Sequence, residues 1–242
     1  MIYTFCRKFA NAYLVETRAG IVLVDSGYLG GAKDFWKFVS RKGLVPTDIK
    51  AVVITHSHAD HVGFLREILD QTGAEVFCHS DHAHVLERGL ADYTGIKASS
   101  RMMQMVLPHS TAGGGTNNEL TPLSKEQLAA LHFVDNEEGK ALLMEKYGLE
   151  ALMTPGHTLS CVSYLLEDVA FVGDVAMNIP LTPKLIPFIV SDRDALVSAW
   201  ETLSTRATVL YLGHGSPILS KQLVARLPYL KSVKIREVKR KE

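Results

Sequence analysis

A stretch of six residues combines three imidazoles with one carboxylate; its members are His56, His58, Asp60 and His61. Neutral imidazole nitrogens and carboxylate oxygens are the usual ligands of zinc and of neighbouring first-row metals. The apolar residues 51–54 predict a short buried strand, and residues 62–69, followed by Gly73, predict an amphipathic helix. The cluster is therefore expected on a strand-to-helix turn, where alternate side chains can diverge toward two metal positions. The alternative for this stretch alone is a surface loop rich in histidine.

Four further segments supply similar chemistry at distant positions. A metal site requires this, because one short loop cannot surround an ion. In each segment a polar residue close to glycine follows or interrupts an apolar, strand-like run: Asp25, His157, Asp174 and His214. Loops of this kind are expected to gather at one edge of a sheet.

The elements that would position these residues alternate between strand and helix signals. Strands are expected at 13–15, 21–24, 75–78, 164–166, 170–172 and 209–212, and helices at 32–41, 81–90, 193–203 and 220–230. The periodicity alone predicts an α/β fold. His132 falls in a helix-like stretch, and His79, His82 and His84 have no evident partners for a third metal.

Taken together and in this order, the five segments resemble the metallo-β-lactamase superfamily of binuclear metallohydrolases, from about Tyr13 to Pro217. The resemblance implies a single domain over residues 1–242, built as a four-layer αββα sandwich with the metals at one edge. It also implies two divalent ions, with zinc expected first and iron or manganese compatible with the same ligands.

The resemblance assigns a role to each polar residue. It gives the first metal His56, His58 and His157, and the second metal Asp60, His61 and His214, with Asp174 bridging both. Asp25 would act from behind a ligand, because metal-bound imidazoles usually donate their other N–H to a carboxylate or carbonyl. The implied reaction is hydrolysis of an ester, thioester or lactone by a metal-bridging hydroxide, which Asp60 would orient.

Departures from individual branches narrow the choice. Asp174 argues against antibiotic hydrolysis, because classical β-lactamases of this fold lack an aspartate at the bridging position. Glyoxalase II enzymes and acyl-homoserine lactonases share every ligand. Two alternatives stay open: a persulfide dioxygenase-like oxygenase with one iron on His56, His157 and Asp174, and a phosphodiesterase or ribonuclease.

Composition is that of an ordinary enzyme with a small-molecule substrate. The 26 basic and 26 acidic residues cancel, so no overall charge attracts nucleic acid or an anionic membrane. No apolar run has the length of a signal peptide or a membrane span. The three cysteines form no metal-binding spacing, and a reducing cytoplasm is expected. A homodimer is compatible with the sequence.

Residues 91–149 fit the alternation poorly. They contain Met102, Met103 and Met105 and then the glycines 113–115. Methionine packs adaptably at apolar surfaces, and glycine-rich loops are mobile, so the segment is predicted to be a lid or pocket wall. The alternative is a helix that packs its methionines on the core, followed by a loop without function.

Overall fold

The computed structural model describes residues 1–93, 95–109, 118–182 and 184–238. The chain forms two compact units. The first unit comprises Met1–Ala91 and Glu119–Ala151, and the second comprises Asp92–Asn118 and Leu152–Glu242. Each unit alternates strands with helices, which confirms the α/β class.

The strands of the first unit lie in the order β7-β5-β4-β3-β2, with β1 beside β2. Their bounds are β1 Ile2–Arg7, β2 Ala10–Thr17, β3 Gly20–Val24, β4 Ile49–Val53, β5 Glu75–Cys78 and β7 Leu131–Phe133. The first three strands pair antiparallel, and β3, β4, β5 and β7 pair parallel. Strands β3, β4 and β5 are mostly apolar, because most of their residues on both faces are buried. The predicted hairpin of 13–15 with 21–24 is confirmed.

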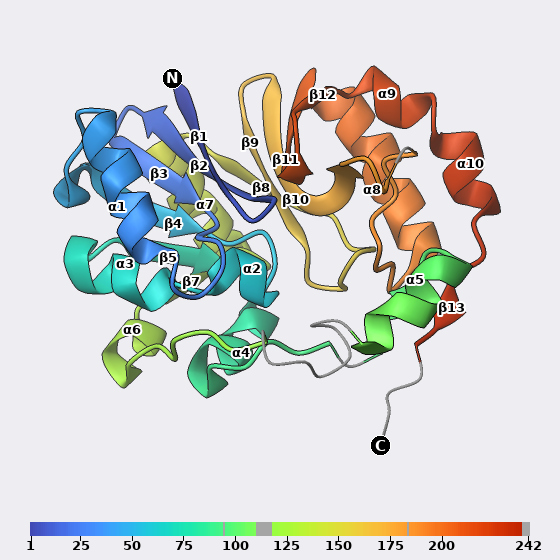
Figure 1. Cartoon of the computed structure of the whole chain (residues 1–242). Coiled ribbons are helices and arrows are strands. Elements are labelled where there is room, and N and C mark those ends of the chain that lie inside the picture. Colours follow the sequence, from blue (N-terminus) through green and yellow to red (C-terminus); the bar gives the residue numbers. More distant parts are fainter. Residues whose placement is uncertain (94, 110–117, 183, 239–242) are drawn as a thin grey trace. The chain divides into compact units, whose positions relative to one another are not determined.

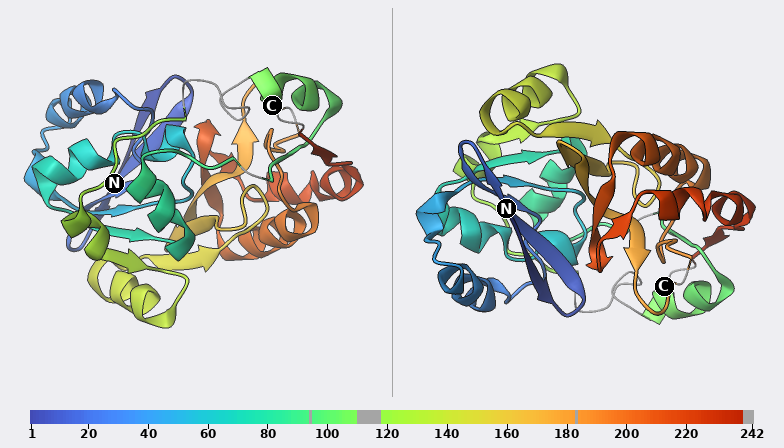
Figure 2. Two further views of the ribbon diagram at one scale, coloured as in Figure 1. Left: turned by 90° about the horizontal axis from the view of Figure 1, so that it is seen from below. Right: turned by 90° about the horizontal axis from the view of Figure 1, so that it is seen from above.

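The helices of the first unit are α1 Ala32–Arg41, α2 Ala59–Val62, α3 Leu65–Thr72, α4 Ala83–Arg88, α6 Lys125–Ala129 and α7 Glu137–Tyr147, with short 3-10 turns at Pro46–Asp48 and Ser80–His82. Both views of Figure 2 show α1 and α7 on opposite sides of the strands. The predicted helix 32–41 is confirmed, and its Phe35 packs edge-on against Phe5 of β1 with ring centroids 5.4 Å apart. The predicted helix 62–69 was wrong in its start, because the chain forms two helices that are interrupted at Gly63 and Phe64.

The strands of the second unit are β9 Val162–Leu166, β10 Val169–Asn178, β11 Val209–Gly215 and β12 Ile218–Leu219. The chain enters this unit through β8, Glu150–Met153, which neighbours β9. β10 pairs parallel with β11 and antiparallel with β9. A separate two-stranded sheet joins β6, Lys97–Ala98, to β13, Arg236–Glu237.

The helices of the second unit are α5 Arg101–Val106, α8 Arg193–Arg206, α9 Lys221–Val224 and α10 Leu227–Ser232, with a 3-10 turn at Leu107–His109 (Figure 1). Trp200 of α8 is fully buried and donates to the Val175 carbonyl of β10 at 2.8 Å. The predicted helix 193–203 is confirmed and runs three residues further, to 206. The predicted helix 220–230 is instead two short helices, and Pro228 lies in the first turn of the second one.

Residues 91–149 divide between the two units. Lys97–Ala98 and α5 belong to the second unit, whereas α6, β7 and α7 belong to the first. The helix-like interpretation around His132 was wrong. His132 lies on β7 opposite Phe77 of β5, and the two rings stack with centroids 4.8 Å apart. The glycines 113–115 lie outside the described residues, and a lid stays a prediction.

Cys78 and Cys161 are buried free thiols, and Cys6 is exposed. Burial raises the pKa of the Cys78 thiol to about 12, so this group stays protonated. Within the described part of the chain, no helix is both long enough and apolar enough to cross a membrane.

Candidate metal centre

The loop after β4 carries the predicted ligand stretch, and backbone contacts fix its path. The amide of Gly63 donates to the Gly27 carbonyl at 2.7 Å, and the amide of Ser26 donates to the His61 carbonyl at 2.6 Å. A Cβ atom on Gly63 would lie 2.2 Å from the Leu29 amide nitrogen. Only glycine fits there, so the chain turns sharply between α2 and α3 and holds His61 against the loop after β3.

The Asp25 carboxylate accepts hydrogen bonds from two residues of this loop, Thr55 and His61. Asp25 directly follows β3 in a left-handed conformation with φ +57, which aspartate tolerates better than most residues, and it is 2% exposed. Its Oδ1 accepts from the Thr55 amide at 2.8 Å, and its Oδ2 lies 2.7 Å from Thr55 Oγ1 and 2.8 Å from His61 Nδ1. A carboxylate accepts hydrogen bonds, so the proton of His61 sits on Nδ1 and Nε2 becomes the ligand atom. The structure places Asp25 behind His61, and its role behind a metal ligand stays a prediction.

Thr55 extends the same network to His56. Its hydroxyl proton goes to Asp25, so its oxygen accepts from His56 Nδ1, 3.1 Å away. The ring of His56 is therefore also oriented with Nε2 as the ligand atom. Sequence reasoning gave Thr55 no role. A hydroxyl directly between a buried strand and the first histidine was the available signal.

The second unit holds His157 differently. His157 Nδ1 lies 3.0 Å from the Ile189 carbonyl oxygen, which can only accept, so Nε2 is again the ligand atom. The His157 carbonyl accepts from Ser191 Oγ at 2.8 Å and from the Ser191 amide at 3.3 Å. Gly156, with φ +144, precedes it, and a Cβ there would lie 2.5 Å from Leu196 Cα. The His157 loop is thus seated on α8 and on residues 189–191.

Asp174 lies between two imidazoles in the same unit. It sits on β10 directly after Gly173, whose φ is +52, and His214 sits on the neighbouring strand β11. Asp174 Oδ2 is 3.7 Å from His157 Nε2 and 3.4 Å from His214 Nε2. The Asp174 side chain is 4% exposed. One carboxylate facing two imidazole nitrogens is the arrangement that a bridging ligand requires.

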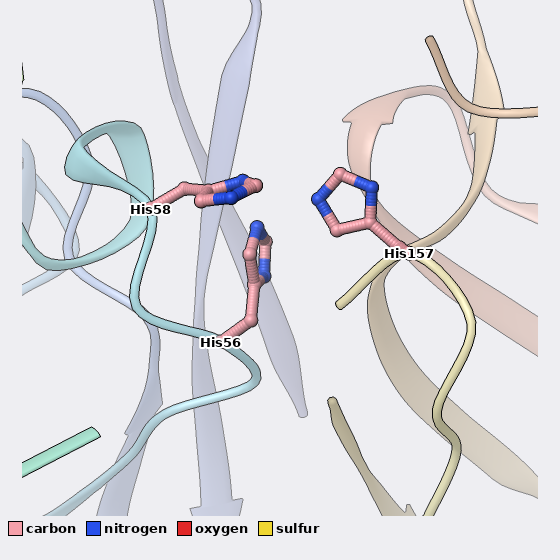
Figure 3. Close-up of side chains that lie close together, drawn as sticks. All are labelled: His56, His58 and His157. Atoms are coloured by element: carbon pink, nitrogen blue, oxygen red, sulfur yellow. The ribbon is translucent and has the colours of Figure 1, made fainter. Parts of the chain in front are cut away.

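Three groups of donor atoms could each hold a metal ion, with the atoms of a group within 4.8 Å of one another. These groups are His56, His58 and His157; His56, His61 and Asp174; and Asp60, His61 and His214. Figure 3 shows the first of them, and in the loop itself the rings of His56 and His58 meet edge to face with centroids 4.7 Å apart. Neutral imidazoles with two carboxylates fit zinc, iron or manganese. All seven predicted ligands occur in these groups.

In the part of the chain that the structure describes, none of the three donor groups includes His79, His82 or His84. His79 caps the 3-10 turn that follows it, because its Nδ1 accepts from the Asp81 amide at 3.1 Å. His84 is exposed on α4. These histidines therefore have structural or surface positions and give no support to a third metal.

The family model of the metallo-β-lactamase superfamily matches residues 7–214. The chain belongs to this superfamily. The matched range contains Asp25 and all seven predicted ligands.

The relatives of this superfamily member share a class of chemistry and differ in substrate. A probable metallo-hydrolase of Bacillus subtilis, YqgX, is 26% identical over 69% of this chain and 65% of its own length, a little under two thirds. The hydroxyacylglutathione hydrolase GloC of Haemophilus influenzae is 23% identical over 81% of this chain and 82% of its own. The exodeoxyribonuclease WalJ of Streptococcus pneumoniae is 22% identical over 84% of this chain and 77% of its own length. The chain is a metal-dependent hydrolase of this superfamily.

A solved structure supports the fold. The B3 metallo-β-lactamase BLEG-1 superposes with a TM-score of 0.66 and 24% identity, covering 96% of this chain and 100% of that one. The predicted α/β fold of the metallo-β-lactamase type is therefore confirmed. At this identity the likeness concerns the fold and carries no statement about the substrate.

Proposed function

We propose that this chain hydrolyses an ester, thioester or lactone of a small molecule with two divalent metal ions, zinc first among them. His56, His58 and His157 would hold one ion and Asp60, His61 and His214 the other. The observation that carries the proposal is the position of Asp174 Oδ2, within 4 Å of the Nε2 atoms of both His157 and His214. A single buried carboxylate so placed suits a pair of ions better than one.

Two ions held there would lower the pKa of a shared water toward neutrality and polarise the substrate carbonyl. The chain's own residues supply the rest. Asp60 Oδ2 lies 3.8 Å from His61 Nε2, and its side chain is 17% exposed, whereas that of His61 is fully buried. Asp60 is therefore the acidic ligand that a substrate can approach, and we assign it the role of orienting the attacking water and passing its proton to the leaving group.

Asp174 and the charge balance separate this proposal from its rivals. An aspartate at the bridging position argues against β-lactam hydrolysis. Equal numbers of basic and acidic residues offer no broad electrostatic attraction for a phosphodiester chain. An oxygenase with one iron would use His56, His157 and Asp174 and would leave Asp60, His61 and His214 without a role. A cytoplasmic location and a homodimer complete the proposal.

The test compares His58→Ala with His84→Ala, which removes an exposed imidazole from α4. Both variants and the parent are assayed with aryl esters, acyl thioesters, γ-lactones and bis-aryl phosphodiesters. We expect His58→Ala to abolish turnover while circular dichroism stays unchanged, and His84→Ala to retain the parent rate. Near-normal turnover of His58→Ala would contradict the proposal. Hydrolysis of the phosphodiester alone would replace it with the nuclease alternative.

A further inference from the structure

A cavity of about 120 Å³ lies in the second unit between α5, residues 181–182 and 184–188, and α10. Met103, Ile186 and Phe188 contribute apolar wall, and Met103 and Ile186 are almost fully buried. The cavity opens to solvent, because Leu181 and Met102 in its lining are 63% and 47% exposed, and its volume suits a small ligand with an apolar body of roughly six carbon atoms.

The cavity lining also contains a cation. Lys184 and Tyr229 both line it, and Lys184 Nζ lies 5.2 Å from the centroid of the Tyr229 ring. Among the described residues, no carboxylate lies within ion-pairing distance of Lys184. An ammonium without a carboxylate beside an apolar chamber suits an anionic head group on an apolar body.

The hydroxyls around the cavity narrow the ligand further. Thr182 Oγ1 donates its proton to the Met177 carbonyl and is used within the fold, whereas Ser100 Oγ only accepts, from the Met103 amide, and keeps its proton for a ligand. Ser99 holds its place through its backbone, which donates to the Phe188 carbonyl at 3.0 Å, and its hydroxyl can serve a ligand. With Lys184 as its one cation and these hydroxyls as donors, the lining matches a monoanion better than a phosphate dianion.

We propose that this cavity binds a short-chain monocarboxylate, with the carboxylate at Lys184 and the aliphatic chain against Ile186 and Phe188. The cavity wall leads directly to a predicted metal ligand. The Val190 amide donates to the Lys97 carbonyl, and the Ser99 amide donates to the Phe188 carbonyl. Residues 97–99 therefore hold the backbone on both sides of Ile189. The Ile189 carbonyl in turn orients His157.

A bound carboxylate would therefore stiffen the segment that holds His157. Carboxylates are also the products of ester, thioester and lactone hydrolysis. Feedback of a product on turnover follows from the site only if the proposed function holds, whereas binding itself does not depend on it.

The experiment is isothermal titration calorimetry of the metal-loaded protein with butyrate, hexanoate and octanoate. Hexanoate has two more methylenes than butyrate, and burial of each of them should tighten binding about fourfold. Octanoate should gain less per methylene, because the cavity is then full. Hexanamide, which keeps the chain and lacks the charge, should bind at least tenfold more weakly than hexanoate.

Variants locate the ligand. Lys184→Met keeps the apolar stem and removes the charge, and Lys33→Met on α1 is its matched control. His58→Ala reports on carboxylate bound at the metal centre instead. We expect Lys184→Met to weaken hexanoate at least tenfold and the other two variants to match the parent.

Two results would overturn the site: no binding of hexanoate by the parent protein, or binding that survives Lys184→Met and is lost in His58→Ala. If Lys184→Met does not fold, the hexanoate and hexanamide comparison on the parent decides. Loss of turnover in His58→Ala with hexanoate binding retained would support both proposals separately.

Discussion

The two units orient their imidazoles by different means. In the first unit, His56 and His61 are held by side chains, namely Thr55 and Asp25. In the second unit, His157 is held by a main-chain carbonyl, that of Ile189, with Ser191 supporting the backbone. Side-chain support can be removed by a single substitution, whereas a carbonyl is present whatever residue carries it.

This difference predicts where the site is fragile. In the first unit one buried carboxylate serves the Thr55 amide, the Thr55 hydroxyl and His61 at once. Its loss should disturb two ligands together. In the second unit the same change of a single side chain should cost little, because the orienting acceptor belongs to the backbone.

The largest effect is expected from Asp25→Asn. Asparagine tolerates the left-handed conformation at this position and keeps the volume, but it presents an amide where His61 and Thr55 need a charged acceptor. We expect the affinity for the ion that Asp60, His61 and His214 would hold to fall roughly 10–100-fold. Competition with a chelator measures it, with Asp34→Asn on α1 as the control for loss of one carboxylate. Parent-like affinity in Asp25→Asn would mean that the network is not needed to orient the ligands.

A smaller effect is expected from Thr55→Val. This variant leaves Asp25 without the hydroxyl and His56 without its acceptor, and we expect about 1–3 kcal/mol less free energy of unfolding. Thr55→Ser keeps the hydroxyl and is the matched control. Urea unfolding of the two variants measures the difference. If both lose the same free energy, the methyl packing matters and the hydrogen bonds do not.

The smallest effect is expected from Ser191→Ala. The Ser191 amide and the Ile189 carbonyl remain, so only the hydroxyl bond to the His157 carbonyl is lost, at about 0.5–1.5 kcal/mol. Metal affinity should stay within about threefold of the parent in the same chelator competition. A loss as large as that of Asp25→Asn would remove the contrast between the two units.

A further prediction uses pH at Glu75, the first residue of β5. Partial burial alone would raise the pKa of the Glu75 carboxyl, but hydrogen bonds from Lys146 and Tyr147 lower it below its usual 4.5. A lowered pKa in the folded state adds stability that is present above the usual value and is lost as pH falls through the folded one. Glu75→Gln should therefore destabilise the protein at pH 7 and do so less at pH 3. Equal destabilisation at both values would show that packing, and not charge, is responsible.

Local patterns predicted much of the fold. The hairpin of β2 and β3, the helix α1 and the strand β5 each carry their own apolar spacing, and the glycines Gly43 and Gly73 adopt the positive φ that ends a helix. β7 was missed because it has only three residues and its partner β5 lies more than fifty residues earlier in the chain. The break between α2 and α3 depends on Gly63 meeting Leu29, which no local spacing encodes.

The site divides in the same way. Residue type and spacing, with the resemblance, singled out the seven residues that make up the three donor groups, and Asp25. Thr55 was readable in principle, because a hydroxyl adjoins the first histidine. The support of His157 could not be predicted from sequence, because any residue at position 189 offers the same carbonyl. The donor side chains are therefore easier to predict from sequence than the backbone contacts that orient them.

The central claim is that one chain holds two divalent ions. Metal content of the purified protein, measured by inductively coupled plasma mass spectrometry against protein concentration, tests it most directly. We expect about two ions per chain, zinc foremost, and a lower content in His58→Ala. One iron per chain in the parent protein, with oxygen consumed in the presence of glutathione persulfide, would contradict it.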